Sequence, residues 1–95
     1  MPVNISIRAL SRRVPIVVHS PGAADVRVTG DFSSWVEHGI RLSHDGRGCW
    51  RTVLSLTPGE YQYRLLVDGA WKDHAEARLR VANPYGSDNC ILKVV

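Results

Sequence analysis

The fold of this chain is decided by residues 61–71, Tyr61-Gln62-Tyr63-Arg64-Leu65-Leu66-Val67-Asp68-Gly69-Ala70-Trp71. Tyr61, Tyr63, Leu65 and Val67 occupy every second position, and Gln62 and Arg64 lie between them, which is typical of a half-buried strand. Asp68-Gly69 follows this strand, and both residue types tolerate positive φ, as a two-residue hairpin turn requires. The stretch therefore predicts an antiparallel hairpin with Arg64 on the face opposite Tyr63 and Leu65.

The same pattern of strands and turns continues outward on both sides of this hairpin. In residues 50–56, Trp50, Leu54 and Leu56 share one face while Arg51 and Ser55 share the other. Further candidate strands are 5–10, 15–19, 26–30, a short piece near Ile40, 77–81 and 90–95, separated by turn sequences at 20–22, 45–46, 57–59 and 83–86. No stretch has a helical period over ten or more residues. These features predict an all-β protein, an antiparallel two-sheet sandwich of immunoglobulin-like type with about seven to eight strands.

The length and composition fit one globular domain. We expect residues 1–95 to form a single domain, with residues 1–13 as an extra strand or a loose arm. Hydrophobic residues make up 44% of the chain and charged residues 22%, which is typical of a globular protein. The apolar runs are too short to cross a bilayer, and polar residues interrupt the N-terminal segment that a signal peptide would need. We therefore expect a cytoplasmic protein with no membrane partner.

Cysteines and histidines give no sign of a metal site. Cys49 and Cys90 do not have the spacing of a zinc motif, and the four histidines are scattered through the chain. A disulfide between the two cysteines is possible in a sandwich, but two separate reduced thiols are expected in a cytosolic protein.

The basic charge of the chain raises the question of nucleic-acid binding. The net charge is +3 and the sequence pI is near 9.2, but Arg12-Arg13 is the only adjacent pair of arginines. A nucleic-acid interface needs basic residues gathered on one face. The dispersed arginines instead favour a solvated, mildly basic surface without a nucleic-acid partner.

No group of residues indicates an enzyme. Ser43-His44-Asp45 contains the residue types of a catalytic triad, but a triad is assembled from different elements, so these neighbours predict a solvated loop. The carboxylates show no context that would raise a pKa, as a glycosidase acid requires. Neither a phosphate-binding nor a dinucleotide-binding glycine motif is present. The sequence therefore favours binding without catalysis and without a cofactor.

The three tryptophans fall into two groups. Trp50 shares a strand face with leucines and is expected in the core, whereas Trp35 and Trp71 are flanked by polar and turn residues. A loop tryptophan can fold back as a lid on the sandwich, but two of them with polar neighbours favour an exposed stacking surface. An indole ring can cover the apolar face of a pyranose while amide, hydroxyl and guanidinium groups bind its hydroxyls.

Three ordered motifs then carry a family resemblance. They are Gly30-Asp31-Phe32-Ser33-Ser34-Trp35, the run from Pro58 through Tyr61-Gln62-Tyr63-Arg64 to Trp71, and Asn83-Pro84-Tyr85-Gly86-Ser87-Asp88-Asn89. Over about three quarters of its length, roughly Asp25 to Val95, the chain resembles a family 48 carbohydrate-binding module. This family includes the glycogen-binding domain of the AMP-activated kinase β subunit and the early-set domain of isoamylases and branching enzymes.

The resemblance implies an early-set sandwich that binds α-1,4-glucan such as glycogen, starch or maltooligosaccharide. The family's stacking tryptophans fall on Trp35 and Trp71, and its basic sugar-binding residue falls on Arg64. The residue that presses on the glucan, its hydroxyl neighbour and the sugar-binding amide fall on Tyr85, Ser87 and Asn89. From the residues alone, a solvated outer position is the favoured interpretation of Arg64, and Asn89 is equally a cap for the turn before the last strand.

The chain also departs from the family pattern at three positions. Kinase-type modules often have Lys in place of Arg64, and Arg forks its hydrogen bonds differently. The proline usual in the loop after Trp71 is missing, since Asp73 is followed by His74-Ala75, which predicts a mobile loop. Tyr85 occupies a leucine-like position and adds an aromatic surface.

An alternative function comes from the same fold. In debranching enzymes this fold often packs beside a catalytic barrel without binding sugar. The rival hypothesis is therefore a scaffolding or protein-interaction domain for a catalytic or kinase partner.

Overall fold

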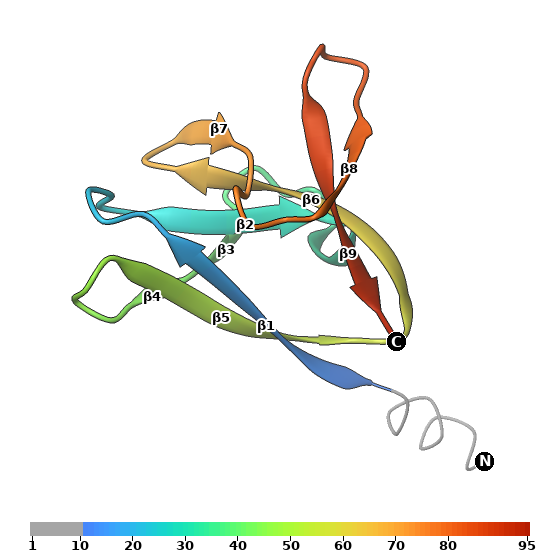
Figure 1. The fold of residues 1–95 in the computed structure, drawn as a ribbon, viewed down its shortest axis with the longest axis horizontal. Coiled ribbons are helices and arrows are strands. Elements are labelled where there is room, and N and C mark those ends of the chain that lie inside the picture. The colour runs from blue at the N-terminus through green and yellow to red at the C-terminus, as the bar shows by residue number, and fades with distance from the viewer. Residues whose placement is uncertain (1–10) are drawn as a thin grey trace.

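The computed structural model describes residues 11–95, which form two antiparallel sheets packed face to face (Figure 1). The strands are β1 (Arg12–His19), β2 (Val26–Gly30), β3 (Ile40–Arg41), β4 (Ser43–His44), β5 (Cys49–Leu56), β6 (Gly59–Val67), β7 (Ala70–Lys72), β8 (Leu79–Ala82) and β9 (Asp88–Val94), with the 3-10 helix η1 at Asp31–Ser33. One sheet has the order β1-β5-β4. The other has the order β3-β2-β6-β9-β8, and β7 also pairs with β6. The predicted all-β sandwich is confirmed, with nine strands in the described residues.

The core lies between the two sheets and is built by the alternation of the strands. Ile16 and Val18 of β1 are buried, and their neighbour Val17 is 36% exposed. In the facing sheet Val26 and Val28 of β2 are fully buried. Because one face of each sheet is covered and the other is not, side chains along a strand alternate between buried and exposed positions.

Two predictions about individual strand residues are confirmed. Trp50 is a core residue, 3% exposed, and its indole donates a hydrogen bond to the Ser20 carbonyl at 3.2 Å. Tyr63 and Leu65 are buried on the core face of β6, and Arg64 lies on the opposite face.

The β6–β7 hairpin forms at the predicted turn. Val67 pairs with Ala70, and Asp68 and Gly69 have φ of 51° and 82°, as a two-residue turn of this type requires. The Asp68 carboxylate accepts hydrogen bonds from the backbone N–H groups of Ala24 and Asp25, both at 2.9 Å. The turn is therefore fixed to the segment before β2 as well as by its own backbone.

Several predicted boundaries were wrong. Strand β1 spans Arg12–His19 and begins earlier than the predicted 15–19, so residues 12 and 13 lie in this strand. The predicted strand 5–10 lies outside the described residues. Strand β8 spans Leu79–Ala82, later than the predicted 77–81. The short strand β4 was not predicted, because two residues carry no readable period and their assignment depends on a neighbour. The predicted hairpin implied a strand after Gly69, and this strand spans Ala70–Lys72.

The segment Ser43-His44-Asp45 is not a loop throughout. Ser43 and His44 form β4 and pair with Arg51 and Trp50 of β5. The His44 ring stacks on Trp50 with centroids 4.4 Å apart, and its Nε2 accepts a hydrogen bond from the Gly48 N–H. His44 therefore covers a core tryptophan.

Both cysteines of the chain lie within residues 11–95. Cys49 and Cys90 are free thiols, as expected. No cluster of three metal-ligating side chains occurs in these residues. Among the same residues, no helix has the length and apolar character needed to cross a membrane.

His74 ties the loop after β7 to both sheets. The side chain is buried, with Nδ1 2.7 Å from the Tyr63 hydroxyl and Nε2 2.8 Å from the Val17 carbonyl oxygen. A carbonyl can only accept, so Nε2 carries a proton and donates to Val17, while Nδ1 contacts the Tyr63 hydroxyl. Burial raises the pKa of the Tyr63 hydroxyl, which keeps it a donor. The mobile loop predicted from the missing proline is therefore anchored at His74.

Replacing His74 by alanine is expected to lower the free energy of unfolding by about 1–3 kcal/mol, because two buried partners lose their hydrogen bonds. Urea denaturation of His74→Ala beside the wild type measures this loss. His38→Ala serves as the control, since His38 is exposed and, within residues 11–95, is bonded only through its backbone carbonyl, to Arg27. An equal midpoint for both variants would contradict the anchoring role.

Candidate functional site

An open cleft of about 530 Å³ lies on the outer face of the larger sheet. It is lined by Trp35, Arg64, Trp71, Asn83, Pro84, Tyr85, Ser87 and Asn89. These residues come from the turn after β2, from β6 and β7, from the β8–β9 loop and from β9. The structure thus brings all six residues singled out in the sequence to one cleft.

Strand register explains why Arg64, Trp71 and Asn89 share this face. Leu66 of β6 lies directly opposite Trp71 of β7, and Arg64 is two residues before Leu66. Gln62 lies opposite Ile91 of β9, two residues after Asn89. Residues opposite each other, or two apart on one strand, point to the same face of a sheet.

Trp71 is a strand residue, and its prediction as a loop residue was wrong. It is the central residue of β7, yet 48% of its surface is exposed, because β7 pairs with β6 alone and Trp71 lies on the outer face of the sheet. The Arg64 guanidinium carbon lies 5.8 Å from the centroid of the Trp71 ring, within the range of a cation–π contact. The ring therefore has a cationic neighbour and a large free apolar surface.

Trp35 is held in the turn that follows η1. Its indole Nε1 donates to Asp31 Oδ1 at 2.9 Å, and Asp31 Oδ2 accepts from the Gln62 backbone N–H at 2.8 Å. Ser34 and Trp35 both have φ near +50°, an uncommon conformation for residues with a side chain. Buried Thr29 supports the turn by donating its hydroxyl to the Val36 carbonyl at 2.9 Å. Asp31 thus fixes the ring of Trp35 to the backbone of β6.

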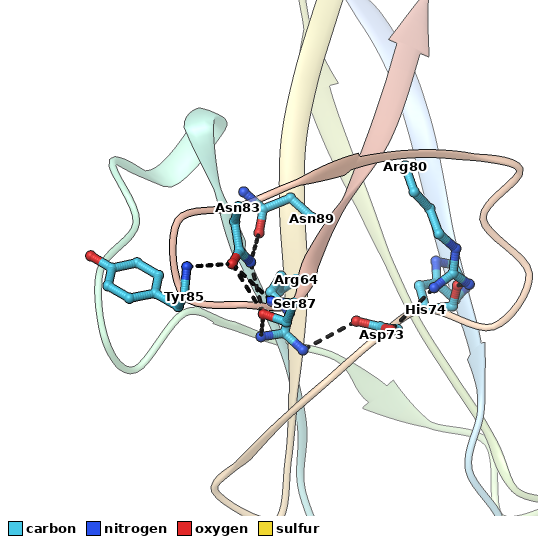
Figure 2. A network of polar contacts seen from close by, with 8 residues as sticks. All are labelled: Arg64, Asp73, His74, Arg80, Asn83, Tyr85, Ser87 and Asn89. Carbon is cyan, nitrogen blue, oxygen red and sulfur yellow. Dashed lines mark hydrogen bonds and ion pairs between the residues drawn. The ribbon is translucent and has the colours of Figure 1, made fainter.

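Asn83 organises the loop between β8 and β9 (Figure 2). Its Oδ1 accepts from the backbone N–H groups of Tyr85 and Ser87 at 3.0 and 3.3 Å. Its Nδ2 donates to Ser87 Oγ at 2.9 Å and to Asn89 Oδ1 at 3.0 Å. Asn83, rather than Asn89, is therefore the residue that caps this turn.

Tyr85 and Asn89 occupy different parts of the cleft. Tyr85 is 90% exposed, and Figure 2 shows its ring pointing away from the polar network. Asn89 donates through Nδ2 to Gln62 Oε1 at 3.1 Å and lies on the sheet itself. One end of the cleft thus has a free aromatic ring, and its floor has a chain of amides.

The carboxylates that contact the cleft residues are engaged in structural bonds. Asp31 uses one oxygen for Trp35 and the other for Gln62. Asp73 uses one oxygen for Arg64 and the other for Arg80, at 3.1 and 3.2 Å. Both oxygens of each carboxylate are therefore occupied by bonds that hold the side chains and backbone of the site in place.

Sequence reasoning missed four residues at this site. Asn83 and Pro84 line the cleft, and Asp31 and Asp73 hold two of its side chains. An Asn-Pro pair at the start of a turn is a readable signal for Asn83. The carboxylate contacts depend on tertiary packing and have no comparable signal.

Comparison with known proteins gives a consistent family. The profile of the family described as "Glycogen recognition site of AMP-activated protein kinase" matches residues 14–95. The chain is 35% identical over 88 residues to Protein FLOURY ENDOSPERM 6, chloroplastic, of Oryza sativa subsp. japonica, covering 92% of this chain and 16% of that protein. It is 33% identical over 93 residues to 5'-AMP-activated protein kinase subunit beta-1 of Sus scrofa, covering 97% of this chain and 73% of the relative. The human subunit beta-1 is 32% identical over 73 residues, which are 77% of this chain and 26% of the relative. The chain thus spans well under two thirds of the rice and human proteins.

Proposed function

From the premise that this chain belongs to the glycogen-recognition family of AMP-activated protein kinase, we propose that it binds α-1,4-linked glucan non-catalytically in the cleft between Trp35 and Tyr85. Trp71 and Trp35 are the stacking surfaces, and Arg64 and Asn89 bind sugar hydroxyls. Ser87 supports Arg64, and Tyr85 extends the apolar surface. Glycogen, starch and maltooligosaccharides all present the required pyranose faces.

The observation that carries this proposal is the half-exposed Trp71 ring beside the Arg64 guanidinium. An aromatic ring of which 48% remains exposed leaves apolar surface in water that a pyranose face can cover. The neighbouring guanidinium and amide groups can bind the hydroxyls around the pyranose rim. A site of this kind combines a few directional bonds with stacking, and it needs no catalytic group.

Native gel electrophoresis with glycogen or amylose in the gel tests the function directly. We expect the wild-type chain to be retarded by both α-1,4-glucans, with dissociation constants of about micromolar to millimolar because association costs offset most of the stacking energy. A gel containing a soluble β-1,4-glucan serves as the control for weak nonspecific retention. Equal mobility in all gels would refute glucan binding and favour the scaffolding alternative, in which the domain contacts a catalytic or kinase partner.

The proposal also covers the protein partners and the cellular compartment of the domain. We place the domain in complexes with a kinase or a glucan-active enzyme, as the name of the subunit beta-1 relatives suggests. The cytoplasm remains our predicted compartment for this chain, although the rice relative is named chloroplastic. Neither a nucleic acid nor a membrane is included among its proposed partners.

A further inference from the structure

We propose that Asp73 is the positioning residue of the glucan site, because it holds the Arg64 guanidinium beside Trp71 without contacting the sugar. This inference rests on the proposed function and adds a residue that determines its affinity. It is drawn from the gap between β7 and β9, where Arg64, Asp73 and Ser87 meet.

The gap arises because β6 changes its pairing partner at Arg64, on the side away from β2. Gly59 to Tyr63 pair with β9, and Leu65 to Val67 pair with β7, so Arg64 stands between the two neighbours. Asp73 directly follows β7, and Ser87 directly precedes β9. The residues that flank the gap are therefore the ones placed to bind a side chain within it.

Arg64 is bound from both sides of this gap (Figure 2). Its Nη2 donates to Asp73 Oδ1 at 3.1 Å, and its Nη1 donates to Ser87 Oγ at 3.3 Å. The Arg64 side chain is only 16% exposed, and its buried Nε–H has no hydrogen-bond partner among residues 11–95. Of the two bonds, the one to Asp73 is shorter and joins opposite charges, so Asp73 dominates the placement of the guanidinium.

Asp73 is itself fixed by its neighbours. Its second oxygen accepts from Arg80 Nη1 at 3.2 Å, and Arg80 Nη2 donates to the His74 carbonyl at 3.2 Å. The next residue, His74, is bonded to Tyr63 in one sheet and to Val17 in the other. The carboxylate is therefore attached to the core through a short chain of bonded groups, and it presents a fixed anchor to Arg64.

A fixed guanidinium binds sugar more tightly than a free one. A free arginine side chain must lose rotamer freedom when it binds a ligand, and a prepositioned one has already done so. Without the carboxylate that pairs with both of them, Arg64 and Arg80 would also repel each other. The repulsion would move the guanidinium from its place beside Trp71, and the regained side-chain freedom would weaken the bond that it offers to a hydroxyl.

The decisive experiment is a double-mutant cycle on glucan affinity. Maltoheptaose binding is measured by isothermal titration calorimetry for the wild type, Asp73→Asn, Arg64→Ala and the double variant. We expect Asp73→Asn to weaken binding on the order of five-fold in the wild-type background and to have no effect in the Arg64→Ala background. A purely structural role would weaken binding in both backgrounds.

Asp88→Asn is the matched control. Asp88 is also an exposed aspartate beside a strand end, since it begins β9 as Asp73 follows β7, and the substitution changes the net charge by the same amount. We expect its affinity to equal that of the wild type. Thermal denaturation of Asp73→Asn checks that the chain remains folded at the titration temperature.

The outcomes separate this inference from the proposed function. If the wild type does not bind maltoheptaose, the proposed function fails and this inference fails with it. If the wild type binds and Asp73→Asn binds equally well, only the positioning role of Asp73 is overturned. Equal weakening by Asp73→Asn in both backgrounds, or by Asp88→Asn, would overturn it as well.

Discussion

Replacing Trp71 by alanine is expected to weaken binding to glycogen roughly 10- to 100-fold. A pyranose that covers half of an indole ring removes about 75–125 Å² of the ring's surface from water. This corresponds to about 2–3 kcal/mol of binding free energy before the cost of association is subtracted. Trp71→Ala removes this surface and leaves Arg64 without its aromatic neighbour. Retention in glycogen gels, compared with the wild type across a range of glycogen concentrations, measures the effect.

Two further variants make this result specific. Trp71→Tyr keeps a flat ring at the same position in β7, so we expect it to retain more affinity than Trp71→Ala. Val53→Ala removes an exposed apolar side chain from β5 in the other sheet, and we expect it to bind like the wild type. If Trp71→Ala were retained as strongly as Val53→Ala, Trp71 would not be a stacking surface.

Replacing Gly30 by alanine is expected to lower the free energy of unfolding by about 2–4 kcal/mol. A Cβ at this position would lie 2.3 Å from the Gln62 carbonyl oxygen and 2.9 Å from the Tyr63 Cα. These are backbone atoms of the central strand β6, so the clash cannot be relieved by rotating a side chain. The substitution must push β2 away from β6, and η1, which begins at Asp31, moves with it.

This second prediction also has a functional part. Displacement of η1 separates Asp31 from the Gln62 N–H and releases Trp35, so glycogen retention should fall along with stability. Gly22→Ala is the matched control, because a Cβ there meets nothing within 4 Å. Chemical denaturation and glycogen gels on both variants measure the two effects. Similar stability for Gly30→Ala and Gly22→Ala would contradict the close packing of β2 on β6.

Much of the fold was predictable because alternation and turn chemistry are local properties. The core placement of Trp50, Tyr63 and Leu65 follows from period two along single strands and is confirmed. The Asp68-Gly69 hairpin is confirmed for a similar reason, since the two residues provide the positive φ angles that the turn needs. Strand β4 was not predicted, because its pairing is decided by β5 rather than by its own sequence.

The candidate site was also predicted in part from the sequence. The sequence motifs brought six residues to attention, and the structure places all six around one cleft, while their role in glucan binding remains a prediction. Trp71 was placed in a loop because polar neighbours and a nearby turn resemble one. It is exposed for a different reason, which is that β7 lies at the outer edge of a sheet.

The sequence by itself determined most strands of the sandwich, the hairpin at residues 68–69 and the outward direction of Arg64, since each depends on neighbours within a few positions. Only the tertiary structure decided that Asp31 holds Trp35, that Asp73 holds Arg64 and that His74 joins the two sheets. Those contacts depend on where strands end relative to one another. The gap between β7 and β9 at Arg64 exists only once three strands have paired, and no single stretch of the chain encodes it.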